Sequence, residues 1–481
     1  MGWFTAEDYT LARLVFQRAL GAVYLVAFLV ALNQFRALLG DRGLLPIPTY
    51  LRGTSFRRAP SIFHWHYSDR FFAVVAVTGA VLAAATVLGV TDRLPLPIAM
   101  LIWLVLWALY LSIVNVGQRW YSFGWESLLL EAGFIAIFLG NSSVAPPLLV
   151  LIALRWLLFR LEFGAGLIKL RGDTCWRDLT CLYYHHETQP MPGPFSWYFH
   201  RLPKPLHRVE VAANHVTQLV VPFGLFLPQP IGGTCAAIMI VTQLWLVISG
   251  NFAWLNWLAI VLALPVLPDG VWQTLMPGLS VDAHADAPLW WVLIGCALAG
   301  AVAVLSWQPV QNLLSRAQAM NASFNAWHLV NTYGAFGSIT RDRFEIVIEG
   351  TRHPSGESGW KEYEFRGKPG DPRRRPGQFA PYHLRIDWLM WFAALSPSYA
   401  QPWFPRLLSR LLEGDRATLR LLRHDPFPEA PPVLLRARRY RYRYTTWEER
   451  RRDGRWWLRE PAGEFMSPVT SADVPVNWHL R

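Results

Sequence analysis

A line of ionisable side chains crosses one of the apolar stretches of the chain. In segment 151–172 (LIALRWLLFRLEFGAGLIKLRG), Arg155, Glu162 and Lys169 are spaced seven residues apart, so they share one face of a helix. Charges within membrane-spanning helices are costly and are usually functional or paired. A lysine in a water-poor pocket can act as a base. The pattern predicts a proton-handling or anion-holding site, or else a structural ion-pair network with Lys169 reaching the membrane surface.

Neighbouring apolar segments carry groups that could complete this arrangement. Two glutamates in the preceding segment could pair with the two arginines, and a histidine lies in the following segment. The structural interpretation is a buried polar network made of Glu126, Glu131, Arg155, Arg160, Glu162 and Lys169. The catalytic interpretation takes Lys169 as the base, with Glu162 and His215 beside it.

A long polar and aromatic loop, residues 170–209, follows the charged segment. Its Cys175 and Cys181 predict a disulfide if the loop faces an oxidising compartment and free thiols if it faces the cytosol. His185 and His186 are metal-ligand types, but no second cluster has suitable spacing. We therefore expect no metal site, and hydrogen bonding at the membrane surface for both histidines.

Several catalytic motifs are absent from the sequence. It contains no G-x-S-x-G elbow, Walker loop, H-E-x-x-H pair or dinucleotide-binding fingerprint. We expect no cofactor, and nothing in these motifs requires the chain to be an enzyme.

The elements that position these residues are mostly long apolar segments. The 481 residues are 53% hydrophobic and 16% charged, whereas soluble domains carry about 25% charged residues. About 20 apolar residues cross a bilayer as a helix. Residues 1–307 are thus predicted to be a mainly α, polytopic membrane bundle with nine spans: 11–32, 71–90, 97–117, 124–140, 146–169, 211–228, 231–249, 252–268 and 289–306.

Residues 308–481 have the pattern of an α+β domain outside the membrane. Alternation predicts a half-buried strand at 344–350, with a hairpin partner at 360–367. Helices are predicted at 381–395 and 404–414. A strand pair with an Asp-Gly turn is predicted at 436–460; its tyrosines share one face and its arginines the other. The arginine face is expected to lie in solvent or on anionic lipid, and no nucleic-acid partner is expected.

Basic residues are unevenly distributed among the short loops. They concentrate in loops 33–70 and 170–209, so these two loops and the C-terminal domain are expected to share one face of the membrane. The positive-inside rule alone would place that face in the cytoplasm.

Long sequence motifs resemble the lipase maturation factor family from about residue 120 to residue 404. They include YSFGWESLLLEAGF (121–134), FRLEFGAGLIKLRGDTCWRDLTCLYYHHETQPMPGPFSWYFHRLP (159–203), HRVEVAANHVTQLVVPF (207–223), GNFAWLNWL (250–258), NTYGAFGSITRDRFEIVIEGT (331–351) and GQFAPYHLRIDWLMWFAAL (377–395). The resemblance implies a membrane protein that assists the folding of lipase-like clients, with the shared face in the endoplasmic reticulum lumen of animal members. The composition resembles a bacterial member, for which the inner membrane and periplasm are expected.

Under this interpretation no catalysis is required, and the loop would contact a partly folded client through Trp176, His185, His186, Trp197, Tyr198 and Phe199. A more distant resemblance runs to the horizontally transferred transmembrane domain of vitamin K-dependent γ-carboxylases. It rests on AGLIKL (165–170), whose lysine, the base in that family, is Lys169. It implies the alternative of an integral-membrane enzyme that acts on a lipid-soluble substrate.

Overall fold

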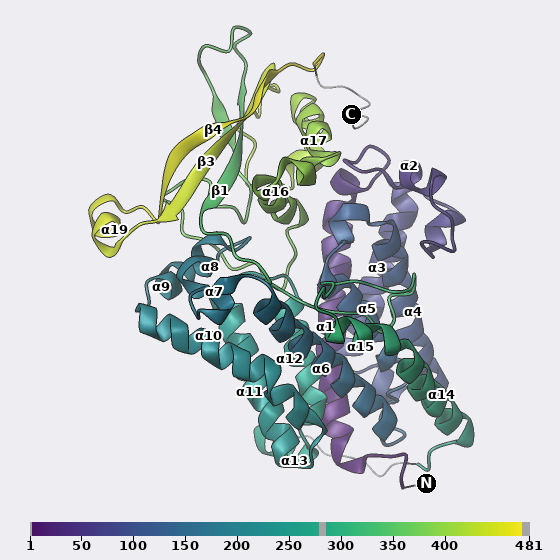
Figure 1. The fold of residues 1–481 in the computed structure, drawn as a ribbon. Coiled ribbons are helices and arrows are strands. Elements are labelled where there is room, and N and C mark those ends of the chain that lie inside the picture. The colour runs from purple at the N-terminus through teal and green to yellow at the C-terminus, as the bar shows by residue number, and fades with distance from the viewer. Residues whose placement is uncertain (1, 279–284, 474–481) are drawn as a thin grey trace.

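The structure, a computed structural model, describes residues 2–278 and 285–473. Helices dominate the chain up to residue 314, and a small antiparallel sheet with its own helices forms the C-terminal domain (Figure 1). The predicted combination of a helical bundle with a C-terminal α+β domain is therefore confirmed.

Five helical segments are long and apolar enough to cross a membrane. They contain α1 (Thr10–Leu38), α3 (Asp69–Val87), α4 (Leu96–Val116), α11 (Ile231–Ser249) and α14 (Leu289–Leu305) continued by α15 (Trp307–Leu314). A sixth span results if Leu255–Val266 and Asp269–Leu275, bent by 112°, count as one. The chain is an integral membrane protein with five or six such candidate spans in the described residues, and the predicted nine are not confirmed.

The remaining predicted spans correspond to helices of a different kind. Helix α5 (Gly124–Ala136) has 13 residues and at about 1.5 Å per residue falls short of the bilayer core. Helix α6 (Leu148–Arg171) has 24 residues but carries the ionisable line. Helix α10 (Lys204–Leu219) begins well before the predicted span and is largely polar. Helices α5 and α6 are mostly buried among the other helices, which explains why their apolar residues resembled lipid-facing ones.

Short helices complete the helical region. Three of them lie in the loop after α6, and others flank the spans: α2 (Ile47–Arg52), α7 (Thr174–Arg177), α8 (Leu182–Thr188), α9 (Ser196–His200), α12 (Leu255–Ala263) and α13 (Asp269–Leu275). Helix α6 contacts α5, α10, α12 and α14. Its polar side chains therefore face protein on several sides.

The C-terminal sheet has the strand order β2-β1-β3-β4, with antiparallel neighbours throughout. The strands are β1 (Arg343–Thr351), β2 (Lys361–Tyr363), β3 (Leu434–Tyr444) and β4 (Trp457–Val469). Both predicted hairpin pairings are confirmed. The half-buried prediction for β1 is wrong, because most of its residues are buried on both faces. Ile346 and Ile348 lie on the side of helix α16 (Arg385–Leu395), while α17 (Trp403–Leu412) contacts β3. Val347 faces the tyrosines of β3.

A helix replaces the predicted Asp-Gly turn between β3 and β4. Thr446 and Glu449 form a capping box that starts α19 (Trp447–Asp453). Gly454 ends the helix with a φ of 66°, a conformation that glycine adopts without steric cost. The capping pattern T-x-x-E was present in the sequence and outweighed the turn signal. Another short helix, α18 (Arg416–Leu419), precedes β3.

The C-terminal domain covers one end of the bundle, opposite the N-terminus (Figure 1). Gln34 Nε2 at the end of α1 donates to the carbonyl of His383 at 2.8 Å, and Arg406 of α17 donates to Leu44 O at 3.1 Å. From the other loop, Arg201 donates to Tyr444 O at 2.8 Å. The prediction that loops 33–70 and 170–209 share a face with the C-terminal domain is confirmed.

Candidate functional site

Lys169 lies at the buried end of α6 among neutral oxygens. Its Nζ donates to Gln218 Oε1 at 2.8 Å and to Asn214 Oδ1 at 3.3 Å, both from α10. It also lies 4.9 Å from the centre of the Trp176 ring, within cation–π range. Lys169 is only 6% exposed, so it does not extend to the surface as the structural interpretation had allowed.

Glu162 lies one amide away from Lys169. Gln218 Nε2 donates to one carboxylate oxygen at 3.1 Å, and Gln243 Nε2 of α11 donates to the other at 2.6 Å. Asn256 of α12 then donates to Gln243 Oε1 at 2.7 Å. A chain of amides therefore separates Lys169 from Glu162, and the two charges share Gln218 instead of forming a direct ion pair.

His215 joins the same region through the backbone of the loop. Its Nε2 lies 3.0 Å from Trp176 O, and its ring lies edge-on to the Trp176 ring at 6.2 Å. Trp176 thus touches both Lys169 and His215. The structure brings the three residues of the catalytic interpretation into one neighbourhood, with Trp176 and Gln218 as the groups that connect them.

The predicted pairing of two glutamates with two arginines is half right. Arg160 forms a buried salt bridge with Glu131. The same carboxylate accepts from Asn331 Nδ2 at 3.0 Å and from Tyr333 OH at 2.8 Å. Arg155 instead donates to Leu225 O at 3.3 Å and lies over the Tyr9 ring.

The segment that carries Asn331 and Tyr333 runs back into the bundle. Tyr333 O would lie 2.4 Å from a Cβ atom at position 164. Position 164 therefore admits this backbone only as glycine, and the backbone closes the Glu131 network.

Glu126 pairs with the C-terminal domain instead of Arg155. Its Oε1 accepts from Arg385 Nη1 at 2.8 Å, and Tyr110 OH donates to its other oxygen. Arg385 also lies 3.4 Å from the centre of the Tyr121 ring. His383 lies 3.6 Å from the carboxylate, but burial lowers the pKa of His383 to about 4, so Arg385 supplies the compensating charge. This pair joins α5 to α16 across the domain boundary.

The loop after α6 is closed by a disulfide between Cys175 and Cys181, as one of the two predictions for these cysteines required. Arg341, just before β1, donates to both carboxylate oxygens of Asp173, at 2.8 and 3.1 Å. Trp176 Nε1 donates to Phe336 O at 2.8 Å. The disulfide and these contacts hold the start of the loop against the segment that leads into the sheet.

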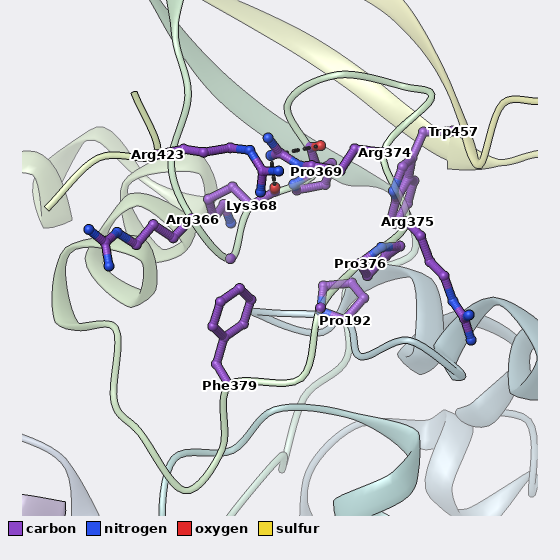
Figure 2. Close-up of a pocket in the computed structure, with 12 residues that line it drawn as sticks. Pro192, Arg366, Lys368, Pro369, Arg374, Arg375, Pro376, Phe379, Arg423 and Trp457 are labelled. Atoms are coloured by element: carbon purple, nitrogen blue, oxygen red, sulfur yellow. Dashed lines mark hydrogen bonds between the residues drawn. The ribbon is translucent and has the colours of Figure 1, made fainter. Parts of the chain in front are cut away.

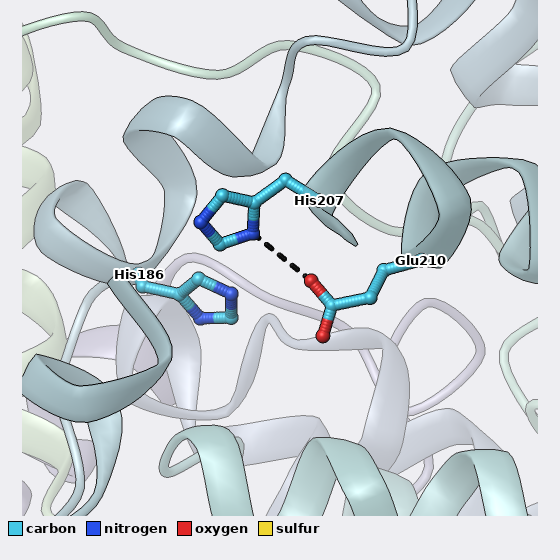
Figure 3. Close-up of side chains that lie close together, drawn as sticks. All are labelled: His186, His207 and Glu210. Carbon is cyan, nitrogen blue, oxygen red and sulfur yellow. Dashed lines mark hydrogen bonds and ion pairs between the residues drawn. The ribbon is translucent and has the colours of Figure 1, made fainter. Parts of the chain in front are cut away.

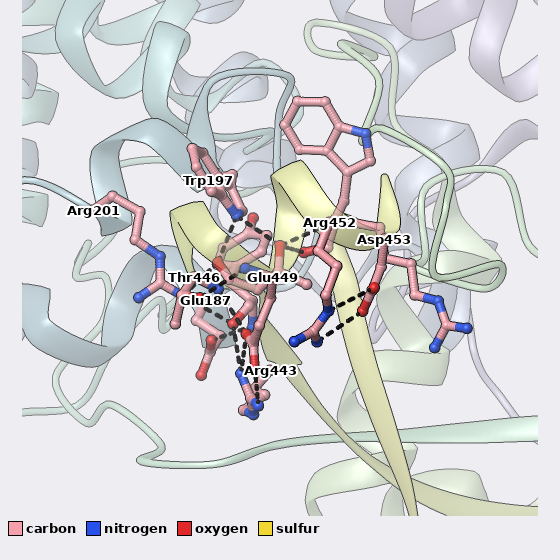
Figure 4. A network of polar contacts seen from close by, with 12 residues as sticks. Glu187, Trp197, Arg201, Arg443, Thr446, Glu449, Arg452 and Asp453 are labelled. Atoms are coloured by element: carbon pink, nitrogen blue, oxygen red, sulfur yellow. Dashed lines mark hydrogen bonds and ion pairs between the residues drawn. The ribbon is translucent and has the colours of Figure 1, made fainter.

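The second half of the loop supports the β3–β4 hairpin (Figure 4). Trp197 Nε1 donates to Thr445 O at 3.0 Å, and Glu187 accepts from the Tyr444 amide at 2.6 Å. Arg443 and Glu449 continue the network at 2.8 Å. Trp197 is fully buried beneath the tyrosine face of β3.

The side chains predicted to contact a client are therefore unequal in exposure. Trp176, His185, His186 and Trp197 are buried, and Tyr198 and Phe199 are half-buried. Phe199 packs edge-on against Trp245 of α11 at 4.8 Å. Most of the loop's aromatics thus build the junction between bundle and sheet, and the four buried side chains do not lie where a client could touch them.

His186 of α8 meets His207 and Glu210 of α10 (Figure 3). One possible ligand atom from each residue lies within 4.8 Å of the others. Burial lowers the pKa of His186 well below its ordinary value, so its imidazole is neutral. The spacing H-x-x-E at 207–210 places two ligand types on one helix face. That spacing is the second cluster that the sequence analysis missed beside the histidine pair.

A small basic cavity of about 90 Å³ lies between the loop and the C-terminal domain (Figure 2). Its basic side chains are Arg366, Lys368, Arg374, Arg375 and Arg423. Most of these cations already have partners, since Lys368 pairs with Glu345 at 3.1 Å and Arg375 donates to Pro194 O at 3.0 Å. The cavity therefore belongs to the packing of the domain junction.

Known proteins resemble both the membrane domain and the C-terminal domain of this chain. The sequence matches the family models for the lipase maturation factor transmembrane domain over residues 11–274 and for its C-terminal domain over residues 329–467. It is 41% identical to lipase maturation factor 1 of Bos taurus, across 98% of this chain and 91% of the bovine protein. The chain belongs to the lipase maturation factor family.

Other members show the same coverage. Identity is 40% with lipase maturation factor 1 of Homo sapiens, over 97% of this chain and 89% of that protein. It is 28% with lipase maturation factor 2 of Homo sapiens, over 98% and 84%. No solved structure matches the chain. Within this lipase maturation factor chain, the Lys169 cluster lies in the first matched region, and Arg385 lies in the second.

Sequence reasoning missed the partners that come from distant segments. Arg385 and Asn331 are separated from their glutamates by 259 and 200 residues. In the sequence, Arg385 and Asn331 are marked as partners of a buried glutamate only by their position in motifs that resemble the family. By contrast, Gln243 and Asn256 are amides in apolar helices, where a polar residue usually has a partner, and that signal could have found them.

Proposed function

We propose that this chain is a membrane-embedded maturation factor that assists the folding of lipase-like client proteins. The observation that carries the proposal is the 41% identity to lipase maturation factor 1 across 98% of the chain, because it includes bundle, loop and C-terminal domain together. In this proposal residues 1–307 form the membrane domain and residues 308–481 the extramembrane domain. The junction between them forms the client-facing end.

The exposed aromatics of this end provide a contact surface for an unfolded segment. Phe195 and Trp447 are 48% and 47% exposed. Trp447 packs edge-on against the buried Trp197 at 4.4 Å, and Tyr198 bridges the same group. Rigid aromatic side chains offer large contact area at a low entropic cost. Client contact is thus assigned to the exposed Phe195 of the loop and the exposed Trp447 of α19, with the buried Trp197 packed beneath Trp447.

The proposed location places this end in an oxidising compartment. The Cys175–Cys181 disulfide lies in the loop that shares a face with the C-terminal domain, and disulfides persist mainly in the periplasm, the endoplasmic reticulum lumen or outside cells. The charge distribution of the loops favours the cytoplasm. We favour the periplasmic face of a bacterial inner membrane, or the lumenal face of the endoplasmic reticulum if the source is eukaryotic. The nine-span count remains part of this proposal.

A single-cysteine experiment tests the location. Cys235 and Cys296 are replaced, the disulfide is kept, and a cysteine is placed at the exposed Ser358. A membrane-impermeant maleimide should then label intact cells. Labelling only after lysis would place the client-facing end in the cytosol, and a secreted client could not reach it.

A co-expression experiment tests the client surface. A secreted lipase is expressed with the wild-type chain or with the double variant Phe195→Ser/Trp447→Ser, and active lipase is measured per amount of lipase protein. The double variant should lower the active fraction at unchanged membrane expression. Trp3→Ser is the matched control, since Trp3 is 61% exposed and lies close in sequence to the N-terminus. Figure 1 shows the N-terminus at the end of the bundle opposite the C-terminal domain. Equal lipase activity with both variants would contradict the proposed surface.

The second candidate is an integral-membrane enzyme with Lys169 as its base. It is favoured by one observation: Lys169 is held by two amide oxygens and an aromatic ring, with Glu162 one amide away. Among the described residues this lysine has no direct carboxylate partner, and a lysine so placed can exchange a proton with a lipid-soluble substrate. Lys169→Met should abolish maturation of the client under this candidate and leave it unchanged under the first.

A further inference from the structure

The histidine–glutamate group between α8 and α10 has more buried polar atoms than the surrounding protein satisfies. Within the described residues, both ring nitrogens of His186, Nε2 of His207 and Oε1 of Glu210 have no hydrogen-bond partner. His186 and His207 are 3% and 2% exposed. A buried polar atom without a partner costs about 1–3 kcal/mol. These unpaired atoms belong to three neighbouring side chains whose possible ligand atoms lie within 4.8 Å of one another, and together they indicate a ligand that binds all three.

The residue types define the chemistry of that ligand. Two imidazoles and one carboxylate are a donor set for zinc, which binds histidine nitrogen and carboxylate oxygen. The side chains converge from two elements (Figure 3), with ligand atoms within 4.8 Å of one another. His207 Nδ1 and Glu210 Oε2 are already 2.9 Å apart, which is near the separation of neighbouring ligands around one ion.

We propose that His186, His207 and Glu210 bind one zinc ion. Three protein ligands leave a fourth tetrahedral position for water or another small donor.

The position of the ion gives it a structural role. His186 lies on α8 and the other two ligands lie on α10, so the ion joins the loop to the bundle. The residue after His186 is Glu187, which accepts from the Tyr444 amide of β3. The ion therefore stabilises the support on which the β3–β4 hairpin rests. This inference stands apart from the proposed function, because metal binding can be measured without a client.

Metal content is the first measurement. Full-length protein with a histidine-free affinity tag is purified in detergent, stripped with a chelator and titrated with zinc. We expect about one zinc per chain for the wild type and about none for His186→Ala or His207→Ala. His424→Ala is the control, since His424 is exposed and far along the chain, and it should bind zinc as the wild type does. Glu210→Gln should weaken zinc binding about tenfold or more.

Two further readouts protect the test against a variant that fails to fold. Cobalt added to the stripped wild type should give visible d–d absorption that zinc abolishes. Zinc, but not magnesium, should also raise the thermal midpoint of the stripped wild type. A wild type that binds neither zinc nor cobalt overturns the proposal. So does a folded His186→Ala variant, judged by its elution in size-exclusion chromatography, that keeps a full zinc equivalent.

Discussion

Glu126 and Lys169 are both buried on helices of the bundle, but different groups compensate their charges. Glu126 has a direct cationic partner, Arg385, which reaches it from the C-terminal domain at 2.8 Å. Lys169 is bound by the neutral amides of Asn214 and Gln218. The first site is an ion pair between domains, and the second is a charge solvated by dipoles within the membrane domain.

The two sites differ in whether the charge is required for stability or is able to change. Removing one partner of a buried ion pair leaves an uncompensated charge, which is strongly destabilising. Removing a charge from a set of neutral amides leaves polar groups that can bond to one another, as Asn214 and Gln218 already do at 3.2 Å. The Glu126 site is therefore suited to fixing the C-terminal domain on the bundle. The Lys169 site can change its charge state without dismantling the fold.

The largest expected effect is that of Arg385→Met. It leaves Glu126 buried without its cation, and we expect a loss of about 3–5 kcal/mol in the free energy of unfolding. Thermal or denaturant unfolding of the detergent-purified protein measures this loss.

The double variant Glu126→Gln/Arg385→Met is the control for charge. It should recover much of the stability, because neither charge then remains buried alone. If the double variant is as unstable as the sum of the two single variants, the pair is not coupled, and its role as a junction between the domains is contradicted.

Asp387, two residues after Arg385, is a buried acid with no cation in a salt bridge within the described residues. Burial raises its pKa from 3.8 to about 6. The folded chain then keeps a proton that the unfolded chain has released between about pH 4 and 6. The stabilisation by the protonated acid is complete below the unfolded pKa and disappears as pH rises through 6, by up to about 1.4 kcal/mol per pH unit.

Asp387→Asn isolates this titration from that of the buried histidines. Asparagine can keep the acceptor for the Gly367 amide and does not titrate. Between pH 4 and 6 the wild type should lose stability relative to the variant, and above about pH 6.5 the difference should be constant. Parallel pH profiles for the two proteins would show that Asp387 is ionised throughout.

The sequence predicted the local elements better than the pairs that join them. Strands β1 and β3, helices α16 and α17 and the line of charges on α6 follow from periodicity, because each depends on residues a few positions apart. The nine predicted spans include α5 and α6, whose apolar residues are largely buried against other helices, and hydropathy does not distinguish protein from lipid as the surrounding medium.

Partner choice within the site could not be predicted in the same way. Arg155 and Arg160 both lay one helix away from Glu126 and Glu131, and only the fold decides that Arg385 reaches Glu126. Likewise, His186 and His207 are 21 positions apart in the sequence, and the contact between α8 and α10 brings them together. Three-dimensional proximity of this kind has no periodic signal.

Lys169→Met tests the second site, where neutral amides surround the buried charge. The variant loses two hydrogen bonds but leaves Glu162 bound by Gln218 and Gln243, so we expect a loss of about 1–2 kcal/mol, clearly less than for Arg385→Met. Lys204→Met is the matched control: Lys204 also lies over an aromatic ring, that of Tyr183 at 5.5 Å, but is exposed, and its replacement should be nearly neutral. A Lys169→Met protein as unstable as Arg385→Met would mean that Lys169 and Glu162 behave as an ion pair after all.

The smallest effect is expected for Arg441 of β3, which pairs with Asp342, just before β1, at 2.6 Å. The two side chains are 54% and 45% exposed, so water and salt screen the interaction. Arg441→Ala should change the free energy of unfolding by less than about 0.5 kcal/mol, despite a shorter contact than that of Glu126 with Arg385. Comparison of Arg441→Ala with Arg385→Met shows whether burial or contact distance determines how much an ion pair contributes to stability. If Arg441→Ala costs as much as Arg385→Met, contact length and not desolvation governs these pairs, and the contrast between Glu126 and Lys169 loses its physical basis.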